Sequence, residues 1–197
     1  LLSREQSGQI AAVGFDLFMR MLEEAAAELG GRPHLAAVEP EVELGGDAFI
    51  PEEYIEDVGE RLMVYKRLAG AANAGSVEAM GEELADRFGA LPPEVDDVLR
   101  VMALRPTLKS LGVESLKAAA SGANFAVAAR FHGSSSVAPE RLAGLVAESP
   151  ESFALRPDGT LVVRMDKEDW RAMVDELAVI LGGLAAGLGL EQAAREN

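Results

Sequence analysis

Carboxylates are the most abundant side chains in this chain that could do chemistry, with 33 Asp and Glu against 18 Lys and Arg. Several acidic pairs are adjacent in the sequence, among them Glu52–Glu53, Asp96–Asp97 and Glu168–Asp169. Adjacent helix residues point about 100° apart, so such pairs do not converge on one reacting atom as an acid/base couple must. Acids near a helix start are also favoured by the helix dipole. We therefore expect these pairs to serve capping and solubility rather than catalysis.

Motifs for other kinds of catalysis are missing from the sequence. There is no cysteine, which excludes thiol catalysis, disulfides and Cys-based zinc sites. The only histidines, His34 and His132, stand in a Pro/Gly-containing segment and at the end of a strand-like run, and we expect both to be solvated loop residues. No Lys follows a Gly as a phosphate-binding loop requires, no GxGxxG opens a helix after a strand, and no GxSxG occurs. We predict no catalytic, cofactor-binding or metal-binding residue in the chain, and therefore no enzyme activity of its own.

One acidic pair is better placed to meet a partner. Glu83 and Asp86 are three residues apart on a predicted helix that ends at Phe88-Gly89, so their side chains share a face. Both lie near the C-terminal end of that helix, where the dipole disfavours negative charge. Such a pair suggests a role toward an external cation, and we name these two residues as the candidate partner-binding site. The alternative is a solvated helix face that Arg87 partly neutralises.

The overall composition indicates a globular and strongly acidic protein. Hydrophobic residues make up 49% of the 197 residues, and the formal net charge is -15, which argues against a broad phosphate-binding face. The longest apolar run, 177–190, is broken by glycines and too short to cross a bilayer. No basic segment precedes an apolar run at the start of the chain. We expect a cytoplasmic protein, with no membrane contact and no direct binding of nucleic acid.

The chain divides by its patterns into an arm, a linker and a domain. Residues 1–30 have apolar positions at helical spacing and end at Gly30-Gly31. Residues 31–48 carry prolines and glycines, and the alternation within Glu39 to Leu44 predicts a short edge strand or an extended linker. The residue pattern changes at Phe49, so we place the domain at 49–197.

The domain is predicted to contain helices first and then strands mixed with helices. Asp57 and Ser76 are expected to cap the first two helices, and Val58, Leu62, Tyr65 and Leu68 are expected to face inward on the first. A third helix starts at Pro92-Pro93 and is expected to be kinked or interrupted at Pro106. The remaining predicted elements are strands at 113–117, 125–131, 153–155 and 161–163, a turn at Pro157-Asp158-Gly159, a helix from Pro139 and a final helix from Trp170. This order predicts an α+β fold: a helical N-terminal arm and linker, then a compact domain of several helices packed on a small antiparallel sheet.

Four stretches of the sequence together carry a resemblance to a known family. They are LLSREQSGQIAAVGFDLFMRML (1–22), FIPEEYIEDVGERLMVYKRLA (49–69), EELADRFGALPPEV (82–95) and LKSLGVESL (108–116). The first resembles the end of the second translocation lobe of bacterial transcription-repair coupling factors, which is shared with the related RecG helicases, and the other three resemble the C-terminal domain of that family. The resemblance is specific over residues 1 to 116, and residues 117 to 197 match only as a pattern of helices and strands.

The resemblance implies a regulatory role for the chain. Members of the family bind stalled RNA polymerase, use ATP and Mg to translocate on duplex DNA, and recruit the repair protein UvrA. By resemblance, the C-terminal domain is an autoinhibitory clamp that docks on a UvrB-like module of the same protein and masks its UvrA-binding surface. The two acids of the family pattern E-x-x-D-R-F-G, here Glu83 and Asp86, would face arginines of that module.

Two alternatives from other classes remain beside the clamp. The domain could act as an adaptor that binds an external repair or transcription protein directly, and it would then bind that partner without the rest of the parent chain. An enzyme acting through carboxylates would need a cleft with perturbed acids, for which the sequence offers no convergent set.

Overall fold

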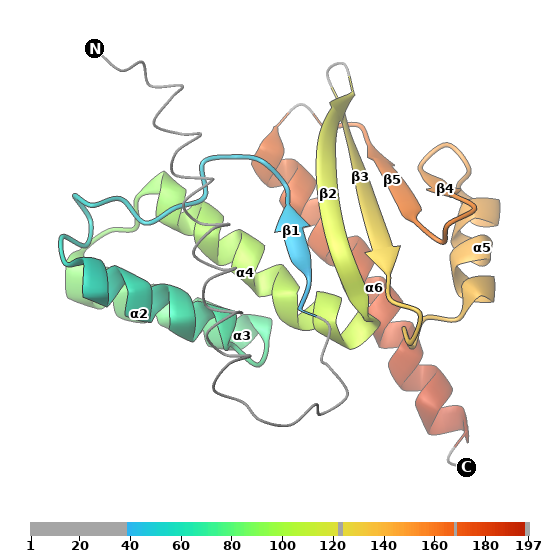
Figure 1. Cartoon of the computed structure of the whole chain (residues 1–197), viewed down its shortest axis with the longest axis horizontal. Coiled ribbons are helices and arrows are strands. Elements are labelled where there is room, and N and C mark those ends of the chain that lie inside the picture. Colours follow the sequence, from blue (N-terminus) through green and yellow to red (C-terminus); the bar gives the residue numbers. More distant parts are fainter. Residues whose placement is uncertain (1–38, 122–123, 168, 196–197) are drawn as a thin grey trace. The chain divides into compact units, whose positions relative to one another are not determined.

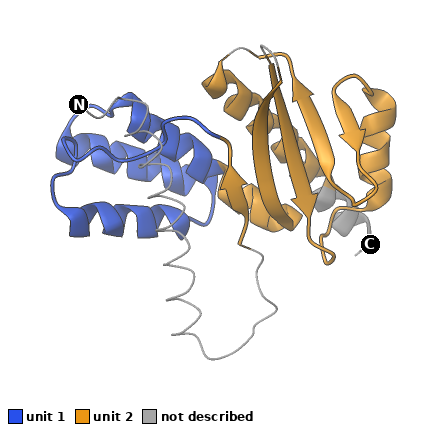
Figure 2. Ribbon diagram, turned by 45° about the horizontal axis from the view of Figure 1, so that its top comes forward, with its two compact units in different colours: residues 1–36, 45–103 blue, residues 37–44, 104–197 orange. Residues whose placement is uncertain are grey.

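The computed structural model describes residues 39–121, 124–167 and 169–195, with side chains described through residue 187 (Figure 1). The described chain falls into two compact units (Figure 2): unit 1 contains residues 45–103, and unit 2 contains residues 39–44 and those from 104 onward. The helix predicted at 1–30 and the first part of the predicted linker, 31–38, lie outside the described residues. The predicted domain boundaries therefore stay predictions.

Unit 1 is built only from helices within its described residues. It contains α2 (Val58–Ala69), α3 (Ala74–Phe88) and the N-terminal part of α4 (Pro93–Leu111). Its core is a cluster of apolar side chains from all three helices and the segment before α2: Ile50, Ile55, Val64, Leu68, Val77, Leu84, Val95, Val98, Leu99 and Met102. Burying a side chain of this size contributes about 1.5–3 kcal/mol, so this cluster is the main source of cohesion in the unit.

The helix ends of unit 1 are fixed by short local contacts. The Asp57 side chain accepts a hydrogen bond from the Glu60 amide at 2.7 Å, as predicted for the cap of α2. The predicted cap of α3 is wrong: Asn73 caps it, and the Ser76 amide donates to the Asn73 side chain at 2.9 Å. The physical reason is that the side chain of a capping residue accepts a hydrogen bond from a backbone amide two or three residues later, and Asn73 is three residues before Ser76. Gly89 ends α3 with a φ of 90°, as its type predicted.

The predicted inward face of α2 is also partly wrong. Leu68 is buried, but Val58 and Leu62 are 58% and 40% exposed, and Val64 takes the second buried position. Apolar residues occupy more of α2 than its neighbours can cover, so the sequence pattern alone could not select the covered stripe. The interruption predicted at Pro106 does not occur either, because α4 runs through it to Leu111. Buried Leu104, Leu108 and Leu111 pack this part of the helix in place.

Unit 2 contains a five-stranded sheet in the order β1-β2-β3-β5-β4. The strands are β1 (Glu41–Glu43), β2 (Val113–Ser121), β3 (Asn124–Phe131), β4 (Phe153–Leu155) and β5 (Leu161–Met165). β1 pairs with β2 in parallel, and all other neighbours are antiparallel. The α+β class is confirmed, and the short strand expected at Glu39 to Leu44 is present. Its parallel pairing makes the sheet mixed rather than purely antiparallel.

Two further helices complete unit 2: α5 (Pro139–Glu148), beside β4, and α6 (Trp170–Arg195), which crosses behind the strands in Figure 1. The buried side chains of α6 are Met173, Val174, Leu177, Leu181 and Leu184, opposite the buried strand residues Leu116, Val127, Ala129, Leu161, Val163 and Met165. Most of the apolar run noted in the sequence therefore belongs to a core helix. The predicted hairpin turn is confirmed: Gly159 has a φ of 82°, and the Asp158 side chain accepts from the Thr160 amide at 3.0 Å.

Candidate protein-interaction site

The two predicted partner-binding acids lie on the last two turns of α3 but differ in their surroundings. Glu83 is half-buried and points toward α2, whereas Asp86 is exposed. Among the described residues, Asp86 has no hydrogen bond or ion pair. Their three-residue spacing places them on neighbouring parts of the helix surface, but only Glu83 belongs to a network.

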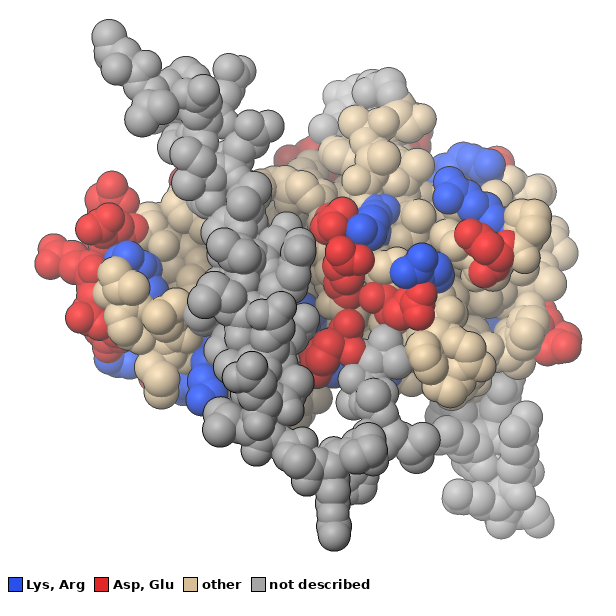
Figure 3. Space-filling view, viewed as in Figure 1, with Lys and Arg blue, Asp and Glu red and all other residues tan. Residues whose placement is uncertain are grey.

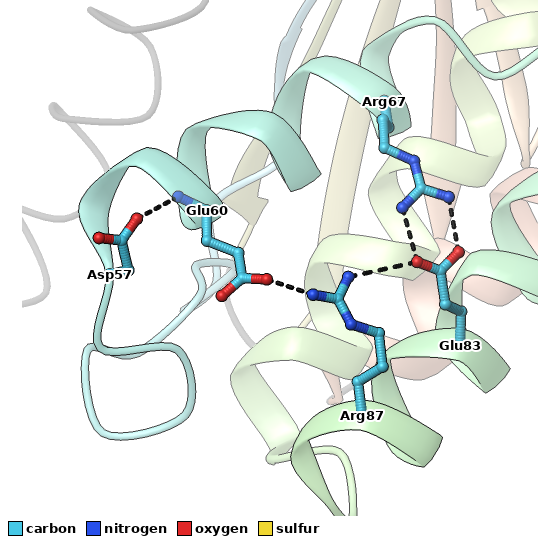
Figure 4. Close-up of polar contacts among 5 residues, drawn as sticks. All are labelled: Asp57, Glu60, Arg67, Glu83 and Arg87. Atoms are coloured by element: carbon cyan, nitrogen blue, oxygen red, sulfur yellow. Dashed lines mark hydrogen bonds and ion pairs between the residues drawn. The ribbon is translucent and has the colours of Figure 1, made fainter.

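Glu83 holds Arg67 of α2 through two parallel contacts (Figure 4). Arg67 Nη1 donates to Glu83 Oε1 at 2.7 Å, and Arg67 Nη2 donates to Oε2 at 2.6 Å. Arg87, one turn further along α3, lies 3.4 Å from Glu83 Oε1 and also donates to Glu60 of α2. Two acids and two arginines thus alternate across the seam between α2 and α3, a geometry that suits planar guanidinium–carboxylate recognition.

This network lowers the pKa of its central acid, Glu83. The hydrogen bonds from Arg67, aided by its charge and by Arg87, lower the pKa of Glu83 from 4.5 to about 2. In return, the hydrogen bond to Glu83 raises the pKa of Arg67. The side chains of Arg67 and Glu83 are 45% and 38% exposed, so water competes for both partners and the pair can be exchanged.

Aromatic residues fix the end of α3 on which the two acids stand. The Tyr54 hydroxyl lies within hydrogen-bond distance of the Leu84 carbonyl, at 3.0 Å, and of the Gly89 carbonyl, at 3.1 Å. Its ring packs on Phe88 at 5.8 Å between centroids, and the Arg87 guanidinium lies 4.8 Å from the Phe88 centroid. Tyr54 is not among the site residues predicted from the sequence. A tyrosine followed later by a Phe-Gly helix end was the available signal, but only the fold brings the two together.

The outer surface of α2 exposes three large apolar side chains, and this exposure was not predicted from the sequence. Val58 is 58% exposed, Leu62 40% and Met63 57%. Met63 lies three residues after Glu60 and four before Arg67, so it borders the charged network on the same helix. Exposed apolar side chains beside exchangeable charges are typical of a surface that binds another protein.

Metal ligands and membrane-spanning helices can be checked for the described residues. They contain no group of three or more His, Asp or Glu side chains that could hold a metal ion. His132 stands at a strand end, as predicted, with its Nδ1 atom 2.7 Å from the Ser134 hydroxyl, and His34 lies outside the described residues. Within the part of the chain that the structure covers, no helix is both long and apolar enough to cross a membrane.

Unit 2 carries both signs of charge on its open strand face (Figure 3). Lys117 lies 3.2 Å from Glu41 and 3.0 Å from Glu43, and Arg130 pairs with Glu114. Such pairs neutralise one another locally, so this face does not form the uniform basic surface that phosphate binding uses.

Comparison with known proteins assigns these elements to a family. The family model described as TRCF domain matches residues 44–140, which include α2, α3, α4 and the Glu83 network. The transcription-repair-coupling factor of Myxococcus xanthus is 35% identical over 164 residues, covering 83% of this chain. That of Escherichia coli K12 is 36% identical over 160 residues, covering 79% of the chain.

The chain belongs to the transcription-repair coupling factor family. It spans about 13% and 14% of the length of these two relatives. The fold agrees as well: the solved structure of a C-terminal domain of transcription-repair coupling factor superposes with a TM-score of 0.61. That match covers 76% of this chain and 93% of the solved domain at 22% sequence identity. The resemblance to this family that the sequence indicated is confirmed.

Proposed function

We propose that this chain is the C-terminal autoinhibitory interaction domain of an ATP-dependent DNA translocase in transcription-coupled nucleotide excision repair. It docks on a UvrB-like module of the same protein and masks the surface that UvrA binds. ATP and Mg act in the motor of the parent protein, and RNA polymerase and duplex DNA are partners of that parent in the cytoplasm. This chain's own part is protein recognition.

The observation that carries the proposal is the composition of the α2–α3 surface. Exposed Met63 lies next to solvent-accessible Glu60 and Arg67, and Arg67 holds Glu83. A docking partner can cover the apolar side chains and at the same time reach a carboxylate that is already aligned for a guanidinium. Asp86, one turn away and without a partner among the described residues, adds a second acceptor for a partner arginine.

The energetics of this surface suit a clamp that must open. Exposed ion pairs contribute about 0–1 kcal/mol each, so replacing Arg67 by a partner's arginine at Glu83 costs little in either direction. A contact made of such exchangeable pairs around a small apolar area is specific but weak. Tethering within one polypeptide then supplies the effective concentration that keeps it closed.

The proposal is tested by titration calorimetry of the chain against the isolated UvrB-like module of its parent. We expect binding that weakens with salt and falls at least tenfold, about 1.4 kcal/mol, in the double variant Glu83→Arg plus Asp86→Arg. Glu52→Arg plus Glu53→Arg is the matched control, because it makes the same charge change at two exposed acids outside the network. That control should bind as tightly as the original chain.

Two results would contradict parts of the proposal. Equal binding by both double variants would retain the docking but remove Glu83 and Asp86 from its interface. Absence of binding even when the module and the chain are joined by a linker would reject the clamp. It would leave the adaptor that binds an external repair or transcription protein.

A further inference from the structure

A second surface of α3 is hollowed and lies on the side away from Arg67. An open groove of about 540 Å³ runs between α3 and α4 within unit 1. Its floor is made of small and apolar residues, among them Gly81, Ala85, Leu91 and Leu99. A Cβ atom at Gly81 would lie 2.9 Å from Leu99 Cδ1, so the Leu99 side chain of α4 packs directly on α3 at this glycine. The groove therefore lies beside a closely packed contact between α3 and α4.

The two margins of this groove differ in charge. On the α4 margin, Asp96 is neutralised by Arg100, whose Nε atom lies 3.0 Å from Asp96 Oδ2. On the α3 margin stand Glu78 and Glu82, both exposed and both without an ion pair or hydrogen bond among the described residues. Asp86 continues this row, so acids recur every four residues along α3 over about 12 Å. Like charges at this spacing destabilise a helix. The row therefore destabilises α3 slightly, and no neighbouring cation among the described residues compensates for it.

From these margins we infer that the groove binds a basic amphipathic helix of a partner protein. Large apolar side chains of that helix, spaced three and four residues apart, would fill the floor. Its Lys or Arg side chains would lie along Glu78 and Glu82. The unit offers no strand edge among its described residues that an extended peptide could extend. The exposed carboxylates that line the groove on its α3 side, Glu78 and Glu82, fit a flanking row of cations.

Charge argues against the chain itself as the occupant. Residues 1–30 contain two arginines and five acids, so this segment would be repelled by the acidic margin. A second copy of the chain could offer the exposed apolar residues of α2, with Lys66 beside them, to the groove. Each copy carries a net charge of -15, however, so two copies would repel one another. The inference is separate from the proposed docking through Glu83 and Asp86, because Glu83 contacts α2 and neither of these two residues lines the groove.

The test uses fluorescence anisotropy of the whole chain with a synthetic, labelled 18-residue helical peptide. The peptide has leucines at three- and four-residue spacing and lysines beside them. Its control has every lysine replaced by glutamate. We expect the basic peptide to bind and the acidic one not to bind. Glu78→Lys plus Glu82→Lys should weaken binding at least tenfold, whereas the control pair Glu52→Lys plus Glu53→Lys should change it less than threefold.

A second variant tests the floor of the groove instead of its charge. Ala85→Phe fills the hollow and should also weaken the peptide at least tenfold, with circular dichroism used to check that the helices are retained. Glu83→Gln should leave peptide binding unchanged, which separates this groove from the proposed clamp. Equal weakening by both lysine pairs would show general attraction of opposite charges and overturn the inference. So would an unaltered affinity in the Glu78/Glu82 variant, or self-association of the chain that the same variant abolishes in sedimentation.

Discussion

Arg67 and Glu83 form a two-point ion pair that joins α2 to α3, with both nitrogen–oxygen distances at 2.6–2.7 Å. The pair lies at the surface, so its value to the fold is modest. Its effect on the surface is larger, because it orients the carboxylate of Glu83 and keeps it ionised even in acid. The candidate partner-binding residue Glu83 is thus oriented by Arg67, which lies sixteen positions earlier in the chain.

Replacing Arg67 by methionine should raise the pKa of Glu83 from about 2 toward its ordinary value of 4.5, because the largest cause of the lowered pKa is the hydrogen bond from Arg67. The measurement is an NMR titration of the Glu83 side-chain carboxyl carbon. Lys66→Met is the matched control, since it removes a neighbouring charge that does not contact Glu83. A titration midpoint that stays near 2 in Arg67→Met would mean that Arg67 is not the cause.

The same pair should make stability depend on pH in acid. The folded pKa of Glu83, about 2, is lower than its ordinary value of 4.5. Its contribution is therefore fully present above about 4.5 and is lost as the pH falls toward 2. Urea unfolding of the original chain and of Arg67→Met should diverge at neutral pH and converge near pH 2. A constant difference between the two across that range would contradict this linkage.

The α+β class, the order of most elements and the turn at Asp158 could be predicted from local pattern. The Pro-Asp-Gly turn and the end of α3 at Gly89 were predicted correctly, because their sequence signals depend on only a few neighbouring residues. The parallel pairing of β1 with β2 could not be predicted, because it joins Val42 to Leu116 across more than seventy residues. No local signal encodes which distant edge a three-residue strand will meet.

The candidate site was predicted only in part for the same reason. The spacing of Glu83 and Asp86 is local, and it located α3 and its solvent side. The partner of Glu83 is set by how α2 packs, and that depends on which apolar stripe of α2 is covered. Because Val64 rather than Leu62 turns inward, Arg67 meets Glu83 and the outer apolar surface remains exposed.

In unit 2, Arg105→Met should lower the free energy of unfolding by about 1–3 kcal/mol. Arg105 is 5% exposed, and it donates to the Pro40 carbonyl at 3.3 Å and to Glu39 at 3.1 Å. These contacts hold the segment that enters β1 against α4. Lys109→Met is the control, because Lys109 reaches the same Glu39 at 2.7 Å from a more exposed position and should cost less than about 1 kcal/mol. Equal losses in urea unfolding would show that burial of Arg105 does not matter.

Gly81→Val should destabilise unit 1 by about 1–3 kcal/mol, because a Cβ atom at Gly81 would lie 2.9 Å from Leu99 Cδ1 and the added methyl groups would displace that packed side chain. Gly75→Val on the same helix is the matched control. The nearest atom to a Cβ atom there is the Asn73 side-chain oxygen at an ordinary 3.4 Å. Thermal unfolding followed by circular dichroism should show a lower midpoint for Gly81→Val only. Similar midpoints for both variants would mean that the Leu99 side chain can move aside at little cost.

The most direct test of the proposed clamp is competition between this chain and UvrA for the UvrB-like module. The module is immobilised, saturated with the chain and then exposed to UvrA, with binding followed by surface plasmon resonance. We predict that the chain reduces UvrA binding at least tenfold, and that Glu83→Arg plus Asp86→Arg abolishes this protection while Glu52→Arg plus Glu53→Arg preserves it. Undiminished UvrA binding to a module that still holds the chain would contradict the masking function.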